Sequence, residues 1–184
     1  MKPQMILGMV MIGLVLQWAV PARAADAEAA KRGKYLVTIA GCADCHTPLK
    51  MGANGPEPDM DRWLSGHPQM LEMPVAPAIP KASPWMAVAS GTMTAWSGPW
   101  GMSFTANLTP DPETGLGSWT EEQFVAAVRT GRHKGMGRPI LPPMPYQNVA
   151  AMTDEDLHAV FSYLQSIPAV KNKVPDPIPP AAIN

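Results

Sequence analysis

The chain has 184 residues, a length typical of one domain, and 16% of them are charged. A formal net charge of −1 excludes a strongly basic nucleic-acid-binding protein, so we expect no nucleic-acid partner. The 22 prolines are an enrichment, but Pro and Gly together stay below the fraction typical of disordered chains. Two cysteines exclude a scaffold held by several disulfides. We therefore expect one compact, loop-rich domain.

The first 24 residues have the composition of an export signal. Lys2 precedes an uncharged, mainly apolar run over 5–16, and residues 22–24 (ARA) supply a small-x-small cleavage site. The apolar stretch extends at most to Val20, which makes it shorter than the ~20 residues that a bilayer-spanning helix needs. We expect cleavage after residue 24, a mature domain of residues 25–184 and a periplasmic location. A retained N-terminal anchor is the alternative.

The first predicted helix of the mature chain spans about 26–39. This stretch is alanine-rich, and Tyr35, Leu36 and Ile39 fall on one face at helical spacing. It leads directly into the only two cysteines of the chain.

The cysteines stand in the motif Cys42-Ala43-Asp44-Cys45-His46, which is C-x-x-C-H, the attachment signature of c-type haem. Two thiols on one short helical turn can each add to a vinyl group of the porphyrin, and the next residue places its imidazole beneath the iron. A thioredoxin-like dithiol would need a βαβ context, and a zinc site would need a ligand from elsewhere. The motif therefore predicts one covalent haem c, bound through Cys42 and Cys45 with His46 on the iron. The dithiol and the zinc site are the alternatives.

Residues 47–118 form a long stretch that is rich in Pro, Gly, Met and Trp and has no apolar period. Its four tryptophans argue against disorder, because such side chains are normally buried: Trp63, Trp85, Trp96 and Trp100. We expect an extended segment that wraps one edge of the haem and is tied down by these aromatic side chains.

Two more helices follow. Thr120 and Gln123 form a capping box for a helix that ends near Thr130, before Gly131. Another helix begins after Thr153 with an acidic first turn, carries apolar residues at helical spacing and ends before Pro168. No segment alternates clearly enough to predict a sheet. The predicted class is all-α, with few helices and long Pro/Gly-rich loops.

These features resemble the class I cytochrome c family, and within it the exported single-haem cytochromes similar to cytochrome subunits of bacterial dehydrogenases. Besides the haem motif, the resembling segments are 33–41 (GKYLVTIAG), 107–111 (NLTPD), 119–124 (WTEEQF), 142–146 (PPMPY), 154–157 (DEDL) and 161–164 (FSYL). The resemblance implies a cytochrome c-like fold around one haem. It also implies that the first and last helices cross closely, with Gly33 accommodating Tyr163. On the same basis, hydrogen bonds near the haem are expected from Asn107, Trp119 and Tyr146.

The distal ligand of such an iron is a methionine sulfur or a histidine nitrogen, or the position is open. Class I cytochromes place their axial methionine between the second and third predicted helices, and Met144 lies there, among the prolines of 142–145. Fixed φ angles at these prolines stiffen the loop, which helps to hold a weak iron–thioether bond. Met136 and Met152 are the competing methionines.

Three histidines and a run of cations are further candidates for contacts with the haem. His67 is expected in a surface loop, His133 in the cationic run 129–138, and His158 in solvent, so each is a weaker distal alternative. Arg138 is the cation nearest the methionine loop. Its guanidinium can offer two donors to a haem propionate, although a solvated basic face is the alternative.

A His/Met haem has no open position for a substrate, and the sequence shows no protein-based catalytic set. The first functional hypothesis is a periplasmic electron carrier, not itself an enzyme, between a dehydrogenase and an oxidase or another cytochrome. The second is a permanent subunit of a dehydrogenase complex, reaching the membrane through its partner, with the Pro-rich tail of 174–184 as a docking strap or a frayed terminus. The third is a haem enzyme or sensor with a labile distal ligand.

Overall fold

The computed structural model describes residues 22–77, 79–80 and 82–180. The export signal predicted for residues 1–24 lies almost entirely outside these ranges, so it stays a prediction. Among the helices of the described chain, none has the length and apolar character needed to cross a membrane. The first helix, α1 (Ala22–Ile39), begins four residues earlier than predicted.

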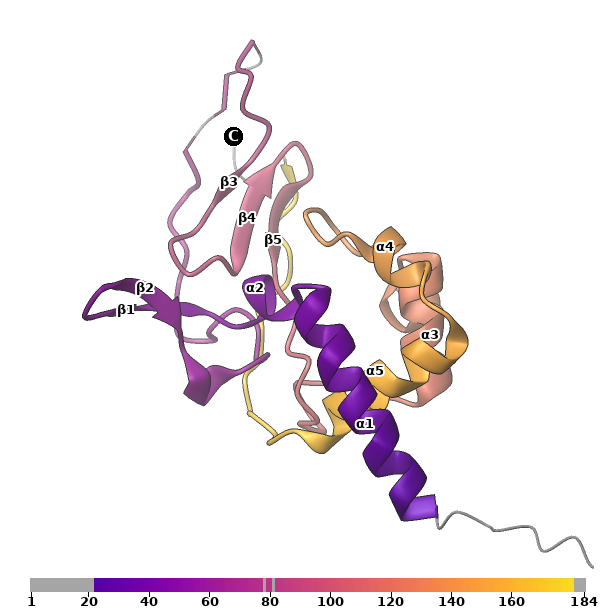
Figure 1. The fold of residues 1–184 in the computed structure, drawn as a ribbon. Helices are drawn as coiled ribbons and strands as arrows, with labels where there is room; N and C mark the ends of the chain where they lie inside the picture. Colours follow the sequence, from indigo (N-terminus) through magenta and orange to yellow (C-terminus); the bar gives the residue numbers. More distant parts are fainter. Residues whose placement is uncertain (1–21, 78, 81, 181–184) are drawn as a thin grey trace, which may run out of the picture.

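Helix α1 packs directly against the last helix, α5 (Asp154–Ser166), and the two cross at Gly33 (Figure 1). A Cβ atom at this glycine would collide with the carbonyl oxygen of Ala159 and would lie 2.8 Å from the Cβ of Tyr163. Only a residue without a side chain lets the two backbones approach this closely. The predicted crossing of the terminal helices is therefore confirmed.

The predicted helix caps are also present. In α3 (Glu121–Thr130), the hydroxyl of Thr120 accepts the backbone N–H of Gln123, and the Gln123 side chain accepts the backbone N–H of Thr120, both at 3.2 Å. Gly131 ends this helix in the left-handed conformation, at φ = 66°. At the start of α5, the Thr153 hydroxyl accepts the N–H of Asp156.

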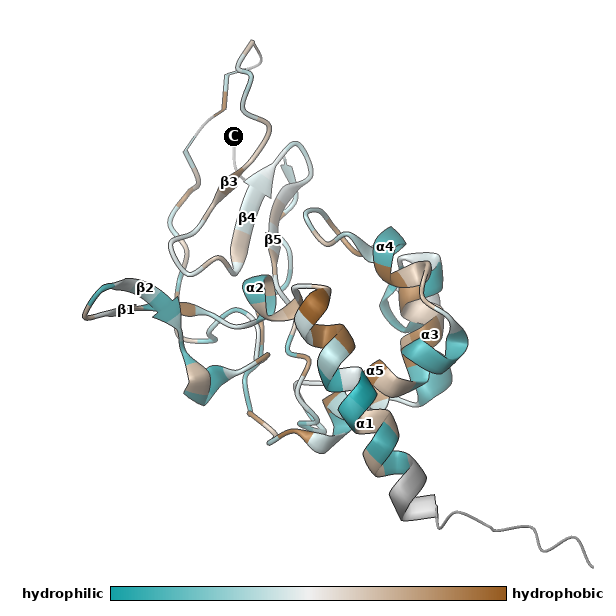
Figure 2. Ribbon diagram, in the orientation of Figure 1, coloured by the Kyte–Doolittle hydropathy of each residue, from teal (hydrophilic) through white to brown (hydrophobic). Residues whose placement is uncertain are grey.

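The hydrophobic core lies between these three helices. Its buried members are Leu36, Val37, Leu64, Leu116, Phe124, Val128, Leu157, Ala159, Val160, Tyr163 and Leu164. Figure 2 shows the C-terminal turns of α1 as strongly hydrophobic where this helix approaches the sheet-containing part of the chain. The indole N–H of Trp63 donates to the Tyr163 hydroxyl at 3.2 Å and so joins the segment after the haem motif to this core.

The predicted all-α class is correct only in part, because two small antiparallel sheets lie within 47–118. One pairs β1 (Leu49–Gly52) with β2 (Gly55–Pro58). The other has the order β3 (Val88–Ala89), β4 (Ala95–Gly98), β5 (Gly101–Phe104).

The sheets were missed because their strands are too short to show a pattern. Each has two to four residues, fewer than an apolar alternation needs to stand out. Glycine lies at the ends of several strands, and β2 contains Pro56 and Pro58, residue types that are depleted in strands.

The helices and sheets occupy different sides of the molecule. In Figure 1, α3 and the short helix α4 (Tyr146–Ala150) lie on one side of α1, and both sheets lie on the other. The short helix α2 (Cys42–His46) follows the C-terminal end of α1, between these two parts. Two 3₁₀ turns complete the described elements, η1 (Met60–Arg62) and η2 (His133–Gly135).

Three of the four tryptophans in 47–118 are half-buried and hydrogen-bonded, but only Trp63 ties the segment to the helical core. Besides Trp63, the indole N–H of Trp96 donates to the Met93 carbonyl, and that of Trp100 donates to the Ser103 hydroxyl, both at 3.2 Å. Trp85 is the exception, because 74% of it is exposed. The expectation that this side chain is buried is wrong, since most residues of its loop, 82–87, are exposed.

The C-terminal segment is part of the fold. Ile178 and Met102 of β5 exchange two backbone hydrogen bonds, of 2.8 and 2.9 Å. Asn172 is almost fully buried, and its amide joins the carbonyl groups of Ser65 and His67 and the backbone N–H of Gln69. The frayed terminus is thus excluded for residues 168–180, which pack on the sheet-containing part of their own chain.

Candidate functional site

The cysteine motif forms its own helix, α2, at a sharp turn after α1. Gly41 makes this turn with φ = 66°, a conformation that costs an L side chain energy. The helical repeat then places the thiols of Cys42 and Cys45 on one turn. Both cysteines are half-buried and free of any disulfide.

The thiols are not tuned for dithiol chemistry. Burial raises the pKa of the Cys42 thiol to about 11, and burial together with the Asp44 carboxylate raises the pKa of Cys45 above its ordinary value. A redox-active pair instead lowers the pKa of its attacking thiol. In the described chain no group of three or more His, Cys, Asp and Glu side chains gathers to hold a metal ion, so the zinc alternative also lacks support.

His46 ends α2 and is held in one orientation. It is 8% exposed, and its Nδ1 lies 2.8 Å from the carbonyl oxygen of Ala106. Because a carbonyl only accepts, Nδ1 carries the proton and Nε2 keeps its lone pair. Burial lowers the pKa of His46, which keeps the ring neutral. A neutral imidazole with one nitrogen fixed and the other free is the form that binds iron.

Met144 lies in a loop that is fastened at both ends. The loop starts at a bridge between Arg132 and Pro139, beside which the Ile140 N–H donates to the Gly131 carbonyl at 2.8 Å. It ends where the Tyr146 ring packs directly over Gly131. In Figure 1 the loop before α4 extends toward β5.

A side chain from the sheet also holds this loop. The Ser103 hydroxyl of β5 donates to the carbonyl oxygen of Pro142 at 2.6 Å. Met144 itself is half-buried. The competing methionines differ from it: Met136 is 88% exposed, and Met152 packs against the helical core. Of the three, Met144 alone combines partial burial with a position in a fastened loop outside the core.

The histidine alternatives have other partners. His67 was expected at the surface, and this is wrong, because its side chain is fully buried. Its Nε2 donates to the Leu71 carbonyl at 3.0 Å, and its Nδ1 accepts from the Thr94 hydroxyl at 2.9 Å. With both nitrogens used, this ring has no lone pair left for iron.

His158 and His133 lie on the helical side. His158 is half exposed, as expected, and its Nδ1 is 2.9 Å from a Glu121 carboxylate oxygen. The His133 ring packs edge-on against Trp119, with 4.9 Å between the ring centres. Burial, and after it the charges of Arg138 and Lys134, lower the pKa of His133.

Asn107 and Arg138, two further residues predicted to contact the haem, have different surroundings. Asn107 is buried among Thr109, Thr114 and Val170, which use both ends of its amide, so its predicted hydrogen bond to a haem lacks support. Arg138 is exposed, and its one described side-chain hydrogen bond, 3.5 Å long, goes to the carbonyl of its own neighbour Pro139. Its guanidinium therefore keeps donors for another partner.

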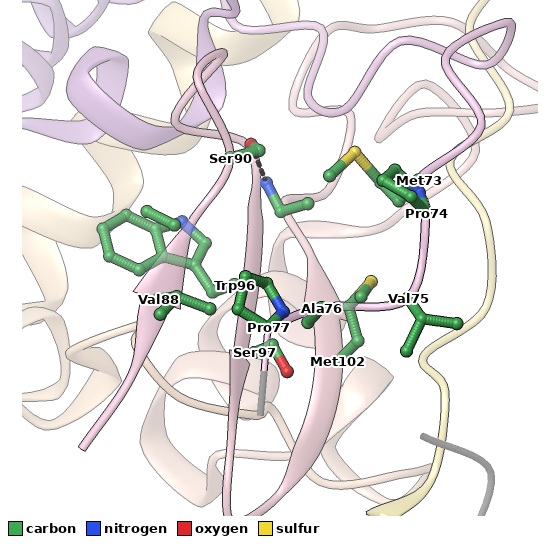
Figure 3. Close-up of a pocket in the computed structure, with 12 residues that line it drawn as sticks. Met73, Pro74, Val75, Ala76, Pro77, Val88, Ser90, Trp96, Ser97 and Met102 are labelled. Carbon is green, nitrogen blue, oxygen red and sulfur yellow. Dashed lines mark hydrogen bonds between the residues drawn. The ribbon is translucent and has the colours of Figure 1, made fainter. Parts of the chain in front are cut away.

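A small apolar pocket lies between residues 73–77 and the sheet β3–β4–β5 (Figure 3). Its volume is about 70 Å³, and the Ser90 hydroxyl beside it accepts the Ala95 N–H at 3.0 Å. None of the five predicted haem-site residues lines this pocket. It is separate from the site at α2.

Sequence reasoning missed two residues that build the site, Ala106 and Ser103. Ala106 acts through its backbone carbonyl, and such a contact leaves no trace in residue type. Ser103 belongs to a strand that the sequence did not reveal, so nothing placed its hydroxyl near the methionine loop.

Comparisons with known proteins bear on this site. The family model described as Cytochrome c matches residues 30–168. The cytochrome c subunit of alcohol dehydrogenase (quinone) from Gluconobacter oxydans (strain 621H) is 32% identical over 170 residues, which are 90% of this chain and 28% of that protein. The gluconate 2-dehydrogenase cytochrome c subunit of Pantoea cypripedii is 31% identical over 133 residues, which are 72% of this chain and 22% of that protein.

The chain thus spans less than a third of the length of these two relatives. The matched family model, in contrast, extends from α1 through the whole of α5 and includes the C-x-x-C-H helix. The chain therefore belongs to the cytochrome c family, whose members bind haem c covalently and use its iron to transfer electrons.

Proposed function

We propose that residues 25–184 form one periplasmic cytochrome domain in which Cys42, Cys45, His46 and Met144 hold the haem. The thiols of Cys42 and Cys45 would hold the haem as thioethers, each formed by addition of S–H across one vinyl double bond without the loss of any atom. The Nε2 of His46 and the sulfur of Met144 would be the protein ligands of the iron. When bound, the haem supplies a one-electron exchange at its iron.

The orientation of His46 is the single observation that carries this assignment. Its hydrogen bond to Ala106 fixes the ring with the Nε2 lone pair free, and burial lowers the pKa of the imidazole, which favours the neutral form. Metal-binding histidines usually have such a partner on their other nitrogen, because it fixes the ring and raises its basicity. The two thiols one turn away match the double attachment of haem c.

The methionine loop supports Met144 as the second protein ligand of the iron. A thioether binds iron weakly, so a mobile loop would lose most of that bond energy to ordering. Here the loop is already fastened through Ser103 on one side and Gly131 on the other. Arg138 lies at the base of the same loop, and we propose that its guanidinium pairs with a haem propionate.

The protein acts as an electron carrier and not as a catalyst of its own in this proposal. A dehydrogenase donates the electrons, and an oxidase or another cytochrome accepts them. The names of the relatives, which are cytochrome subunits of dehydrogenases, also support a second form of the proposal, a permanent subunit that reaches the membrane through its partner. Size-exclusion chromatography of a native extract separates the two forms, since co-elution with a large dehydrogenase contradicts a free carrier.

Absorption spectra of the purified holoprotein test the ligands. We expect sharp reduced bands and a weak far-red thioether band that disappears in Met144→Ala. The band should persist in Met136→Ala, a matched control with an exposed side chain. Survival of the band in Met144→Ala would show that another residue binds the iron. Rapid binding of carbon monoxide to the ferrous wild type would instead favour a haem enzyme or sensor.

A further inference from the structure

The charges of this chain are divided unevenly. From Gln123 to Thr153 the sequence has no Asp or Glu, yet this stretch contains four cations, Arg129, Arg132, Lys134 and Arg138. The rest of the chain holds ten Lys and Arg residues against fifteen Asp and Glu residues. A positive region therefore stands on a protein whose remaining charge is negative.

Two of these cations, Arg132 and Lys134, are available to a partner protein. Arg129 is used, because its guanidinium pairs with Asp154 at 2.6 Å. In the part of the chain that the structure describes, no carboxylate pairs with Arg132, Lys134 or Arg138. Arg132 is exposed and donates to the Gly137 carbonyl at 3.0 Å. The Lys134 ammonium lies 5.4 Å from the centre of the Trp119 ring.

Residues 132–138, which we call the cationic turn, are held in a fixed shape. The His133 N–H donates to the Arg138 carbonyl at 2.9 Å, and the bridge from Arg132 to Pro139 closes the turn. The charges of Arg138 and Lys134 also act on the imidazole of His133, because they contribute to its lowered pKa. A preformed turn loses little conformational freedom when a partner binds.

The tip of the cationic turn is apolar. Met136 is 88% exposed, and glycines stand on both sides of it, so nothing covers its side chain within the turn. Transient interfaces commonly combine a small apolar centre with a charged rim, and methionine adapts its shape to different partners. The turn has this composition.

The cationic turn also stands beside the proposed electron-transfer site. The chain passes from it directly into the loop of Met144, and the Ile140 N–H fastens that loop to Gly131, just before the turn. A partner bound at the turn would therefore lie at the base of the methionine loop.

We propose that the cationic turn is the docking site of a redox partner with an acidic surface. Arg132 and Lys134 pair with carboxylates of the partner, while Met136 forms the apolar centre of the contact. Arg138 remains with the haem propionate. This inference rests on the proposed function and adds to it the chemistry of the partner and the place where it binds.

Electron exchange with two small oxidants of opposite charge tests the inference on the reduced holoprotein. Hexacyanoferrate(III) is an anion and tris(1,10-phenanthroline)cobalt(III) is a cation, and each accepts one electron from the ferrous haem. We expect the rate constant for hexacyanoferrate(III) to fall as ionic strength rises, although the net charge of the protein predicts the opposite. The rate constant for the cobalt complex should not fall.

Substitutions that each remove one positive charge show where hexacyanoferrate(III) approaches the protein. Lys134→Gln should lower the hexacyanoferrate(III) rate about threefold at low ionic strength and leave it unchanged at high ionic strength. Lys171→Gln is the matched control, because it removes the same charge from a lysine that pairs with Glu113 at 2.7 Å outside the turn. Equal effects of the two variants would contradict docking at the turn. Transfer to neither oxidant would instead contradict the proposed function itself.

Amide NMR spectra of the ferrous holoprotein identify the class of partner. Titration with a hexaglutamate peptide should shift the signals of residues 132–138 in the wild type and much less in Lys134→Gln. Shifts centred on another surface would overturn the proposal. Binding to phosphatidylglycerol vesicles without a response to the peptide would also overturn it, in favour of a membrane surface.

Discussion

The helical part of the molecule and the segment 47–118 are stabilised in different ways. Apolar side chains at helical spacing join α1, α3 and α5, and only Leu64 and Leu116 represent the segment in that core. Conversely, every buried polar residue of the described chain lies in 47–118 except His46 and Asn172. The helices thus depend on packing, whereas the segment depends mainly on hydrogen-bonded polar groups, and in the described chain only the buried hydroxyls of Ser65 and Thr105 lack a partner there.

This difference matters for the site, because each part supplies something to it. α1 leads into the helix with the two thiols and His46, whereas the segment supplies Ala106 to orient His46 and Ser103 to hold the methionine loop. The chemistry depends on both kinds of stabilisation at once. Substitutions that weaken one part selectively therefore test whether the two parts are stabilised separately.

The largest effect is expected for Gly33→Leu. The new side chain would collide with the backbone of α5 at Ala159, and a backbone cannot rotate away, so we expect a loss of about 3 kcal/mol or more in the free energy of unfolding. Thermal melts monitored by circular dichroism measure it. Gly91→Leu is the control, because open space surrounds Gly91. Equal melting temperatures for the two variants would show that packing at the crossing is unimportant.

Asn172→Ala should have the next largest effect, and it should act on the other part. The substitution leaves the buried carbonyls of Ser65 and His67 and the N–H of Gln69 without their partner, which should cost about 2 to 3 kcal/mol. Hydrogen exchange should speed up within 47–118 before it changes in α1 and α5. Asn148→Ala, at an exposed position in α4, is the control. Uniform acceleration across the protein would contradict separate stabilisation of the two parts.

His67 should make the stability of the segment 47–118 depend on pH. Burial lowers the pKa of this imidazole in the folded protein, while the unfolded value stays near ~6.5. As the pH falls below that value, His67 binds a proton in the unfolded chain but not in the folded protein, so the free energy of unfolding decreases. One proton gives a slope of at most ~1.4 kcal/mol per pH unit, and the slope ends at the folded pKa.

Urea titrations of the holoprotein between pH 7.5 and 5 measure this slope. We expect His67→Gln to have a shallower dependence than the wild type. His158→Gln, at a half-exposed position on α5, is the comparison variant. An unchanged slope in His67→Gln would remove His67 as the source.

The smallest effect is expected for Thr120→Ala at the start of α3. The variant loses the side-chain half of the capping box, which should cost about 1 kcal/mol. Thr130→Ala is a control at the other end of the same helix, where the hydroxyl bonds only to nearby carbonyls of Ala126 and Gly135. A change in the hydrogen exchange of 47–118 in Thr120→Ala would contradict the independence of the two parts.

The same contrast explains what the sequence could reveal. The caps at Thr120, Gly131 and Thr153 depend on residue types at fixed local spacings, so they were predictable from the residues alone. The haem motif is likewise local. The crossing at Gly33 joins distant residues and was predictable only through the resemblance to class I cytochromes. His67, in contrast, was predicted at the surface because its partners, Thr94 and the Leu71 carbonyl, are brought to it only by the folded chain.

The prolines of β2 have a consequence for the behaviour of the protein at high concentration. β2 is an outer strand of a two-stranded sheet, and an open strand edge can pair with another molecule. Pro56 and Pro58 are exposed there and have no N–H to offer an incoming strand. The hairpin is thereby protected against edge-to-edge aggregation, and replacing both prolines with threonine should make the protein precipitate at lower concentration.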